Sequence, residues 1–271
     1  MNDPSPAFPL RRTDLSAAYD EYYRSGLYDA RYPRPNPALL RLVLRSIGGC
    51  PARVLDFGCG SGRYALPILA ASPASVVGYD SSAEALRSLR QRGAAAIAAG
   101  RLRLADGPFE AVAETLRRDG LVDLALLAFG VLAHITGRGR RIAVLRQLAG
   151  LLAPDGRVIV TVPNGRRRFA SEQRAAAALV ASGQLEPGDV IYRRGSGGTP
   201  IDLTYHMFSA AEFVADLAEA GLRPLSLEPE SVLAESLVTR HALAAWADTL
   251  LRRVVPLRFA YGFAAVTVPQ L

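Results

Sequence analysis

Short apolar runs alternate with longer amphipathic stretches along most of the chain. The apolar runs are rich in Val, Leu, Ile and Ala and lie at residues 54–57, 75–80, 102–105, 122–129 and 157–162. Runs of this length and composition predict buried parallel strands. The stretches between them have apolar residues at helical spacing and predict helices. An alternation of strands and helices in this order predicts an α/β protein with a mostly parallel sheet.

Several predicted helices begin at residues that favour helix N-termini. These residues are Thr13, Asn36, Ser81 and Ser209. Ser81 and Ser209 each have a Glu three residues later, which fits a capping box. Residues 153–156 are expected to form a turn into the fifth strand. The alanine- and leucine-rich stretch 242–255 predicts a helix that packs over a ligand pocket or another subunit, with a membrane surface as the alternative.

A glycine-rich turn, residues 58–62, joins the first predicted strand to a helix. Glycine has no Cβ and tolerates positive φ, so a ligand can approach the backbone closely here. In the dinucleotide pattern G-x-G-x-x-G, a third glycine would stand at position 63, which is Arg63. Asp56 precedes the first glycine, and its carboxylate suits a ligand with ammonium and sulfonium groups. A tight turn between two packed elements is the purely structural alternative.

This D-x-G-x-G-x-G pattern resembles the first motif of class I S-adenosylmethionine (SAM) methyltransferases, and the resemblance covers about residues 36–268. It implies a three-layer, Rossmann-like fold with a mostly parallel seven-stranded sheet and an antiparallel last strand. It also implies SAM as cofactor and S-adenosylhomocysteine as product. The implied cofactor contacts in this part of the chain are Asp56, Gly58, Cys59, Gly60, Gly62, Asp80, Ser81, Asp106, Gly107 and Phe129.

Two acidic residues follow the second and third predicted strands. Asp80 lies 20 residues beyond Gly60, a spacing at which a carboxylate reaches a ribose hydroxyl. An acid favoured by the dipole of a helix start is the structural alternative. Asp106 ends the third strand, where the resemblance implies a bond to the adenine amino group. A helix N-cap is its alternative role.

Residues 1–35 are expected to form a tail and an aromatic cap in front of a methyltransferase domain at 36–271. The cap, rich in tyrosine, is interpreted either as a packed overhang or as a lid on the cofactor. The resemblance implies that Tyr23 and Arg31 contact the cofactor and that Tyr28 contacts the methyl acceptor. Arg31 is suited to a carboxylate.

His134 is the first candidate general base. It follows the fourth strand, at the carboxyl edge where open α/β sheets bind ligands. Histidine titrates near neutral pH, which suits proton transfer. A hydrogen-bonded structural histidine is the alternative. His206 and Tyr205 are the next candidates for the catalytic role.

The connection 164–208 is longer than an α/β unit requires, and we expect it to bind the acceptor. The acceptor contacts expected with Tyr28 are His134, Arg166, Arg168 and Tyr205. A solvated surface is the alternative for the arginines.

Composition adds little to these motifs. The net charge is +7, yet all 32 basic residues are arginine, a bias that weakens the argument for a nucleic-acid partner. Cys50 and Cys59 are expected to be free thiols, and no metal site is expected from three scattered histidines. Residues 1–10 do not resemble a signal peptide, and no apolar run approaches a membrane span. We therefore expect a cytoplasmic protein.

The resemblance predicts in-line transfer of a methyl group from SAM to an oxygen or nitrogen of a small molecule. A narrower resemblance, to tRNA wobble-uridine carboxymethyl methyltransferases, makes tRNA the alternative acceptor. It is carried by Arg31-Tyr32, the block from Arg140 to Asp155, and residues 205–208, whereas 162–164 depart from that pattern. A SAM-binding partner protein without turnover is the third hypothesis, and a homodimer is compatible with each.

Overall fold

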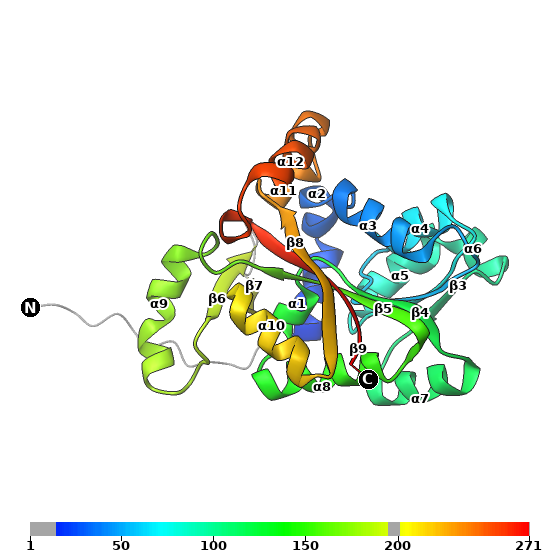
Figure 1. The fold of residues 1–271 in the computed structure, drawn as a ribbon, viewed down its shortest axis with the longest axis horizontal. Coiled ribbons are helices and arrows are strands. Elements are labelled where there is room, and N and C mark those ends of the chain that lie inside the picture. The colour runs from blue at the N-terminus through cyan, green and yellow to red at the C-terminus, as the bar shows by residue number, and fades with distance from the viewer. Residues whose placement is uncertain (1–14, 195–200, 271) are drawn as a thin grey trace, which may run out of the picture.

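A seven-stranded sheet forms the centre of the computed structural model, which describes residues 15–194 and 201–270 (Figure 1). Its strand order is β3-β2-β1-β4-β5-β9-β8. The bounds are β1 Arg53–Phe57, β2 Ser75–Tyr79, β3 Leu102–Ala105, β4 Val122–Leu127, β5 Leu152–Pro163, β8 Leu222–Ser231 and β9 Gly262–Pro269. Strands β1 to β5 pair in parallel, and β9 is antiparallel to both neighbours. The predicted α/β class and antiparallel last strand are confirmed.

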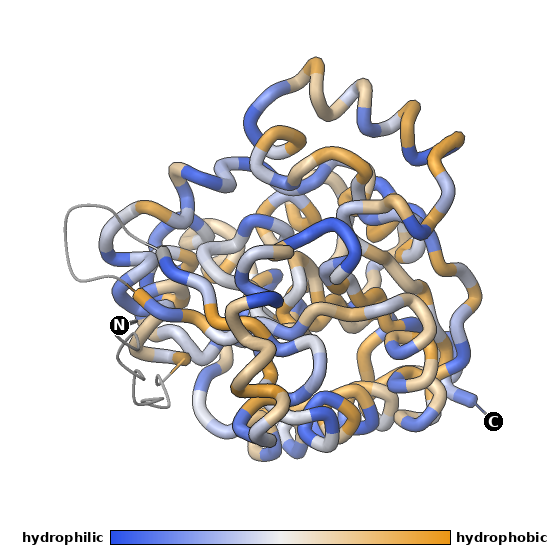
Figure 2. The backbone as a smooth tube through the Cα atoms, turned by 90° about the vertical axis from the view of Figure 1, so that its left-hand side faces the viewer, coloured by the Kyte–Doolittle hydropathy of each residue, from blue (hydrophilic) through white to orange (hydrophobic). Residues whose placement is uncertain are grey.

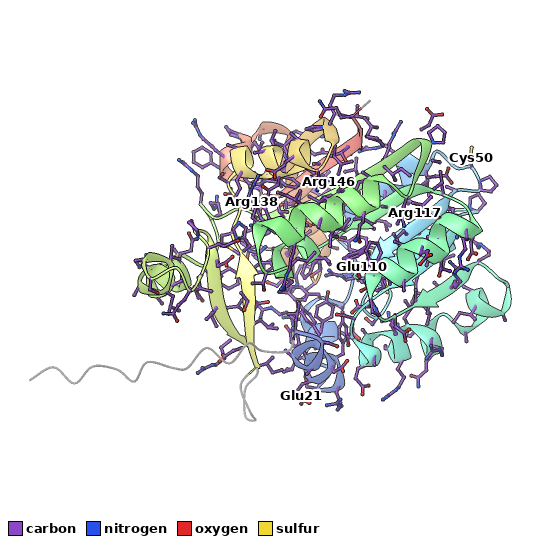
Figure 3. The ribbon with its side chains drawn as sticks, turned by 90° about the horizontal axis from the view of Figure 1, so that it is seen from below. Glu21, Cys50, Glu110, Arg117, Arg138 and Arg146 are labelled. Atoms are coloured by element: carbon purple, nitrogen blue, oxygen red, sulfur yellow. The ribbon has the colours of Figure 1, made fainter. Side chains whose placement is uncertain are left out.

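Helices cover both faces of this sheet. One face carries α3 (Pro37–Ile47), α4 (Ala65–Ala71) and α5 (Ala83–Arg92). The other carries α7 (Phe109–Asp119), α8 (Arg138–Ala149) and α10 (Ala210–Glu219), which Figure 3 shows from below. Neighbouring strand residues serve opposite faces, because side chains alternate along a strand. Thus Val54 packs with the first group of helices and Leu55 with the second.

The remaining elements add to the layered core. Helices α1 (Leu15–Arg24) and α2 (Leu27–Arg31) precede it, and α1 contacts α5 and β7. The segment 164–208 contains α9 (Ala170–Ala181) and a hairpin of β6 (Asp189–Arg194) and β7 (Ile201–His206), at the left of Figure 1. The other helices are α6 (Ala94–Ala98), α11 (Glu235–Val238), α12 (Ala242–Val254), and the 3-10 turns η1 (Val131–His134) and η2 (Leu257–Phe259).

Two of the predicted caps hold, and one is displaced. The Asn36 side chain accepts hydrogen bonds from the amides of Ala38 and Leu39, and Ser209 forms both bonds of its capping box. Ser81 was the wrong N-cap for α5: Ser82 occupies that position, and its hydroxyl accepts a bond from the Ala85 amide. The expected cap at Thr13 lies outside the described residues.

The expected turn at 153–156 is part of β5. Leu152 pairs with Val122 and Arg157 with Leu124, so the residues between them form an irregularity within one strand. The Pro-Asp-Gly sequence predicted a turn, but strand pairing on both sides of it keeps the segment in the sheet. Within the described ranges, no helix is long and apolar enough to cross a membrane.

Asn36 provides a test of how the chain before the sheet is anchored. Its amide also donates to the Glu230 carbonyl at 3.1 Å, in a fully buried position. We predict that Asn36→Ala lowers the free energy of unfolding by about 2 kcal/mol, because a cap and a buried hydrogen bond are lost. Urea unfolding measures this, with Arg45→Ala, an exposed change on the same helix, as control. Equal stability of the two variants would contradict the assignment.

Candidate active site

The glycine turn after β1 is held against the end of β2. The Tyr79 carbonyl accepts hydrogen bonds from the amides of Gly58 (2.7 Å) and Cys59 (3.0 Å). The Asp80 carboxylate accepts from the Gly60 amide at 2.8 Å and from the Ser82 amide at 2.9 Å. Asp80 therefore joins the turn to the start of α5 and stands between them at the carboxyl edge of the sheet.

Glycine is required in this turn for both conformation and space. Gly58 and Gly60 have φ of +77° and +55°, which other residues rarely adopt. The Tyr23 hydroxyl occupies the space that a Cβ at Gly60 would need, and Val131 does the same at Gly58. The bare backbone thus lets groups from α1 and from the loop after β4 approach closely.

A cavity of about 380 Å³ lies above this turn. Its walls come from α1, α2, α7, α8 and the carboxyl ends of β1, β2 and β4. Eight of the predicted site residues line it: Tyr23, Tyr28, Gly58, Cys59, Asp80, Ser81, Phe129 and His134. A mainly apolar cavity with a few convergent polar groups is typical of a small-molecule site.

One wall of the cavity is aromatic. Phe57, Tyr79 and Phe109 all line it, and their ring centroids lie 4.7–5.1 Å from one another. Glu110 lines the same region and Asp80 follows Tyr79 directly. Their planes are inclined to one another by 43° to 87°, and an aromatic wall of this kind beside two carboxylates suits a purine ring with its ribose.

Asp106 and Gly107 do not line this cavity. Asp106 is exposed, and α7 begins after Pro108 without a side-chain cap, so the alternative role of Asp106 as a helix N-cap is wrong. The Gly107 carbonyl accepts a hydrogen bond from the Tyr79 hydroxyl at 3.1 Å. Glu110, four residues beyond Asp106 along the chain, lines the cavity instead.

Asp56 lies buried beneath the glycine turn. One of its carboxylate oxygens, Oδ2, has no hydrogen-bond partner among the described residues. Burial, together with the nearby Asp80 charge, raises the pKa of Asp56 to about 7. A buried acceptor without a partner is costly unless a donor or a cation reaches it. An ammonium group bound at the turn is a suitable partner, so these residues fit the cofactor that the sequence implied.

Arg63 was not assigned a role from the sequence. Its side chain is 8% exposed and lines the cavity, and its Nε and Nη1 have no hydrogen-bond partner among the described residues. The guanidinium carbon lies 3.6 Å from the ring centroid of Phe129, a residue with φ of +63°. Its position directly after the glycine turn is the one feature of the sequence that could have indicated a ligand contact. The geometry offers a buried cation to a carboxylate.

His134 is held by two hydrogen bonds. Its Nδ1 lies 3.1 Å from the Thr204 carbonyl, and its Nε2 lies 2.7 Å from the Tyr19 hydroxyl. A carbonyl only accepts, so Nδ1 is the donor, and the neutral ring accepts from Tyr19 at Nε2. Both Tyr19 and His134 line the cavity. The sequence did not assign Tyr19 to this pair, because nothing local connects residues so far apart.

The other two candidate bases are not at the cavity. His206 is buried, with Nδ1 at 2.7 Å from Asp189 and Nε2 at 2.8 Å from Glu212. Burial lowers the pKa of His206, but the bonds to the two carboxylates outweigh it and the net pKa is raised. With both nitrogens held by carboxylates, His206 has a structural role. Tyr205 stacks behind His134 with ring centroids 4.4 Å apart, and burial raises its pKa.

The His206 cluster includes a fully buried arginine. Ligand atoms of Glu186, Asp189 and His206 lie within 4.8 Å of one another, a spacing compatible with a metal ion. Arg141, however, lies 3.1 Å from Glu186 and 3.4 Å from His206. A guanidinium among the ligand atoms opposes a second cation. We interpret the cluster as an ion-pair network that attaches the 164–208 segment to α8.

The remaining predicted residues lie outside the cavity. Arg31 is exposed and donates to the Tyr32 hydroxyl at 2.9 Å. Arg166 is exposed, whereas Arg168 is largely buried with its guanidinium carbon 4.7 Å from the Tyr261 ring centroid. Gly62 faces a separate surface hollow. Cys59 is a buried free thiol and Cys50 an exposed one, which confirms the absence of a disulfide between them.

Comparison with known proteins agrees with the fold. Residues 54–156 match the family described as "Methyltransferase domain". A ubiquinone/menaquinone biosynthesis C-methyltransferase, UbiE of Geotalea daltonii, is 32% identical over 123 residues, which are 44% of this chain and 49% of that protein. The human probable tRNA methyltransferase 9B is 30% identical over 109 residues, 40% of this chain and 21% of that protein. The chain thus spans at most about half of these relatives.

Among solved structures, the CcbJ methyltransferase of Streptomyces caelestis has a TM-score of 0.60 and 19% identity. The match covers 88% of this chain and 91% of that one. Residues 54–156 are thus similar to a methyltransferase domain, and the described chain has the fold of class I SAM-dependent methyltransferases. SAM is the cofactor of this class, and the cavity residues fit it.

Because the pKa of Asp56 is raised, the free energy of unfolding should depend on pH. The folded protein keeps a proton on Asp56 up to about pH 7, whereas the unfolded chain releases it near pH 3.8. Wild-type stability therefore falls across this window, by up to about 1.4 kcal/mol per pH unit from this group. We predict that Asp56→Asn gains stability relative to wild type as the pH rises. Urea unfolding between about pH 5 and about pH 8 measures the difference.

The control is Asp155→Asn, an exposed carboxylate. Its stability difference from wild type should stay constant over the same range. A constant difference for Asp56→Asn as well would contradict a buried, protonated Asp56.

Proposed function

We propose that this protein transfers a methyl group from SAM to an oxygen or nitrogen of a small molecule bound in the same cavity. The observation that carries the proposal is the hydrogen-bonded Tyr19–His134 pair, which lines the cavity above the glycine turn. SAM supplies a methyl group on a sulfonium that is already activated. The protein mainly has to align the acceptor and to remove its proton.

The cofactor would be held by residues of β1, β2 and α7 and of the turns that follow β1 and β2. Asp80, Tyr79 and Phe109 line the cavity. Asp80 would accept hydrogen bonds from the ribose hydroxyls, and the wall of Tyr79 and Phe109 would hold the adenine. Asp56 and Arg63 are placed near the turn for the ammonium and carboxylate of the methionine portion. The ammonium would then pair with the Asp56 carboxylate, and the cofactor carboxylate with the Arg63 guanidinium. Each buried charge would thus have a partner of opposite sign, and such charge-assisted hydrogen bonds are strong.

The Tyr19–His134 pair can accept a proton from the acceptor. The Tyr19 hydroxyl donates to His134 Nε2, so its oxygen retains a lone pair. As Tyr19 takes a proton from an acceptor hydroxyl or amine, it passes its own to Nε2. Burial raises the pKa of Tyr19 well above its ordinary value, so the tyrosine begins the step protonated. Positioned acid–base groups of this kind contribute about 10²- to 10⁴-fold to rate.

The segment 164–208 contributes to this step indirectly. Its described residues do not line the cavity, but the Thr204 carbonyl in β7 holds His134 Nδ1 and fixes the tautomer. The ring of Tyr205 supports the other side of the imidazole. We therefore propose that this segment positions the base, in place of the expected direct contacts to the acceptor.

tRNA is the second candidate acceptor. The match to the human probable tRNA methyltransferase favours it, although only 21% of that protein is covered. An acceptor carboxylate would need no base, so the Tyr19–His134 pair favours the small molecule. Incubation with methyl-labelled SAM, in parallel with a small-molecule extract and total tRNA, separates the two. Label in the extract supports our proposal, and label in tRNA contradicts it.

Cofactor binding tests the different positions of Asp80 and Asp106. We predict that Asp80→Asn weakens SAM binding about ten-fold or more in calorimetry, because the ribose and the Gly60 amide lose a charged acceptor. Asp106→Asn is the matched control and should bind SAM within about two-fold of wild type, since its side chain is exposed. A larger loss of SAM affinity in Asp106→Asn than in Asp80→Asn would contradict the proposed position of the nucleoside.

Measurements of kcat test whether the Tyr19–His134 pair acts as the base. Tyr19→Phe and His134→Gln should each lower kcat about 100-fold or more on the acceptor identified by labelling, with SAM affinity retained. The double variant should be no slower than the slower single variant, because the two residues act as one relay. His241→Gln, an exposed histidine on the surface, is the control. Unchanged kcat in both single variants would remove the relay from the mechanism.

A further inference from the structure

Exposed apolar side chains are concentrated in one segment, residues 237–259. Of nine exposed large apolar side chains among the described residues, six belong to it. They are Leu237, Leu243, Trp246, Leu250, Val254 and Phe259, with exposed fractions from 43% to 82%. Monomeric proteins rarely leave such a patch uncovered, so this concentration indicates an interaction surface.

Four of these side chains form one stripe along α12. Leu243, Trp246, Leu250 and Val254 are spaced by three or four residues, which places them on one face of a helix. We call this stripe the α12 face.

The opposite side of α12 is attached to the protein. The buried Asp248 carboxylate accepts bonds from the amides of Val232 and Leu233, both at 2.8 Å, and Arg252 donates to the Pro229 carbonyl. The helix is thus fixed with its apolar face outward. It projects from the same end of the molecule in Figure 1 and Figure 2.

Positive charges surround the α12 face. Within 233–259 the two acids, Glu235 and Asp248, are 3% and 1% exposed, whereas Arg240, Arg253 and Arg258 are exposed. Two exposed arginines from outside the segment also touch it. Arg34 donates to the Thr239 carbonyl, and Arg41 to the Thr249 hydroxyl.

None of these five arginines takes part in an ion pair within the described part of the chain. The surface is therefore apolar at its centre and cationic at its rim, and it presents no exposed carboxylate of its own.

We infer that the α12 face docks on an anionic lipid surface. Apolar and aromatic side chains of such a helix enter the boundary between headgroups and acyl chains, while arginines contact the lipid phosphates. A second copy of this chain is a poorer occupant, because a two-fold contact through this face would bring like-charged arginine rims together. The inference rests on this surface and is independent of the proposed reaction.

Trp246 makes the inference directly measurable, since it is the single tryptophan of the chain. Its side chain is 65% exposed, so its emission should shift to shorter wavelength when the α12 face enters a bilayer. We expect this shift, together with co-sedimentation, on vesicles of phosphatidylcholine mixed with phosphatidylglycerol. Binding should weaken as salt is added, because the arginine contacts are screened.

Two variants test the surface, and a third is the control. The double change Leu243→Gln and Val254→Gln should weaken vesicle binding about ten-fold or more, because apolar burial is lost. Arg253→Gln should weaken it about five-fold. Leu225→Gln, an apolar residue of β8 with similar exposure to Leu250, is the matched control and should bind as wild type does.

Three results would contradict the inference. One is the absence of a shift with the anionic vesicles. Another is a shift that depends on protein concentration without lipid and coincides with dimers in sedimentation, which would assign the α12 face to a second copy. The third is equal binding to pure phosphatidylcholine, which would contradict the role given to the arginines.

Discussion

The attachment of the glycine turn to the end of β2 is the constraint on which the rest of the site depends. Tyr79 uses its carbonyl to hold two turn amides, and Asp80 uses its carboxylate to hold the Gly60 amide. These bonds fix three positions of a segment whose glycines would otherwise be highly mobile. Because the turn is already ordered before a ligand binds, it loses little further conformational entropy on binding.

Elements outside the parallel sheet complete this site. Helix α1 supplies Tyr19 and Tyr23, and the latter packs on Gly60, where a side chain would exclude it. The β6–β7 hairpin holds His134 through the Thr204 carbonyl. Under the proposed function, the sheet would position the nucleoside end of the cavity, and the added elements would position the proton-transfer end. This division matches a fold in which the shared core serves one cofactor and the additions vary with the acceptor.

Local patterns in the sequence were sufficient for the fold and for part of the site. Apolar runs gave the strands, and the glycine turn with Asp80 and His134 lay at strand ends, which parallel topology brings to one edge. Asp106 was misplaced because its exposure depends on how the chain leaves β3 toward α7. His206 was misassigned because its partners, Asp189 and Glu212, come from other elements. Arg63 and Tyr19 were missed for the same reason: their surroundings are set by tertiary packing.

Calorimetry of the wild-type protein with SAM and with NAD tests the central claim most directly. We predict that SAM binds and that NAD does not. Arg63 stands where a dinucleotide turn has its third glycine, and Asp56 leaves a buried carboxylate oxygen that a pyrophosphate cannot satisfy. Binding of NAD without binding of SAM would contradict the assignment of this cavity.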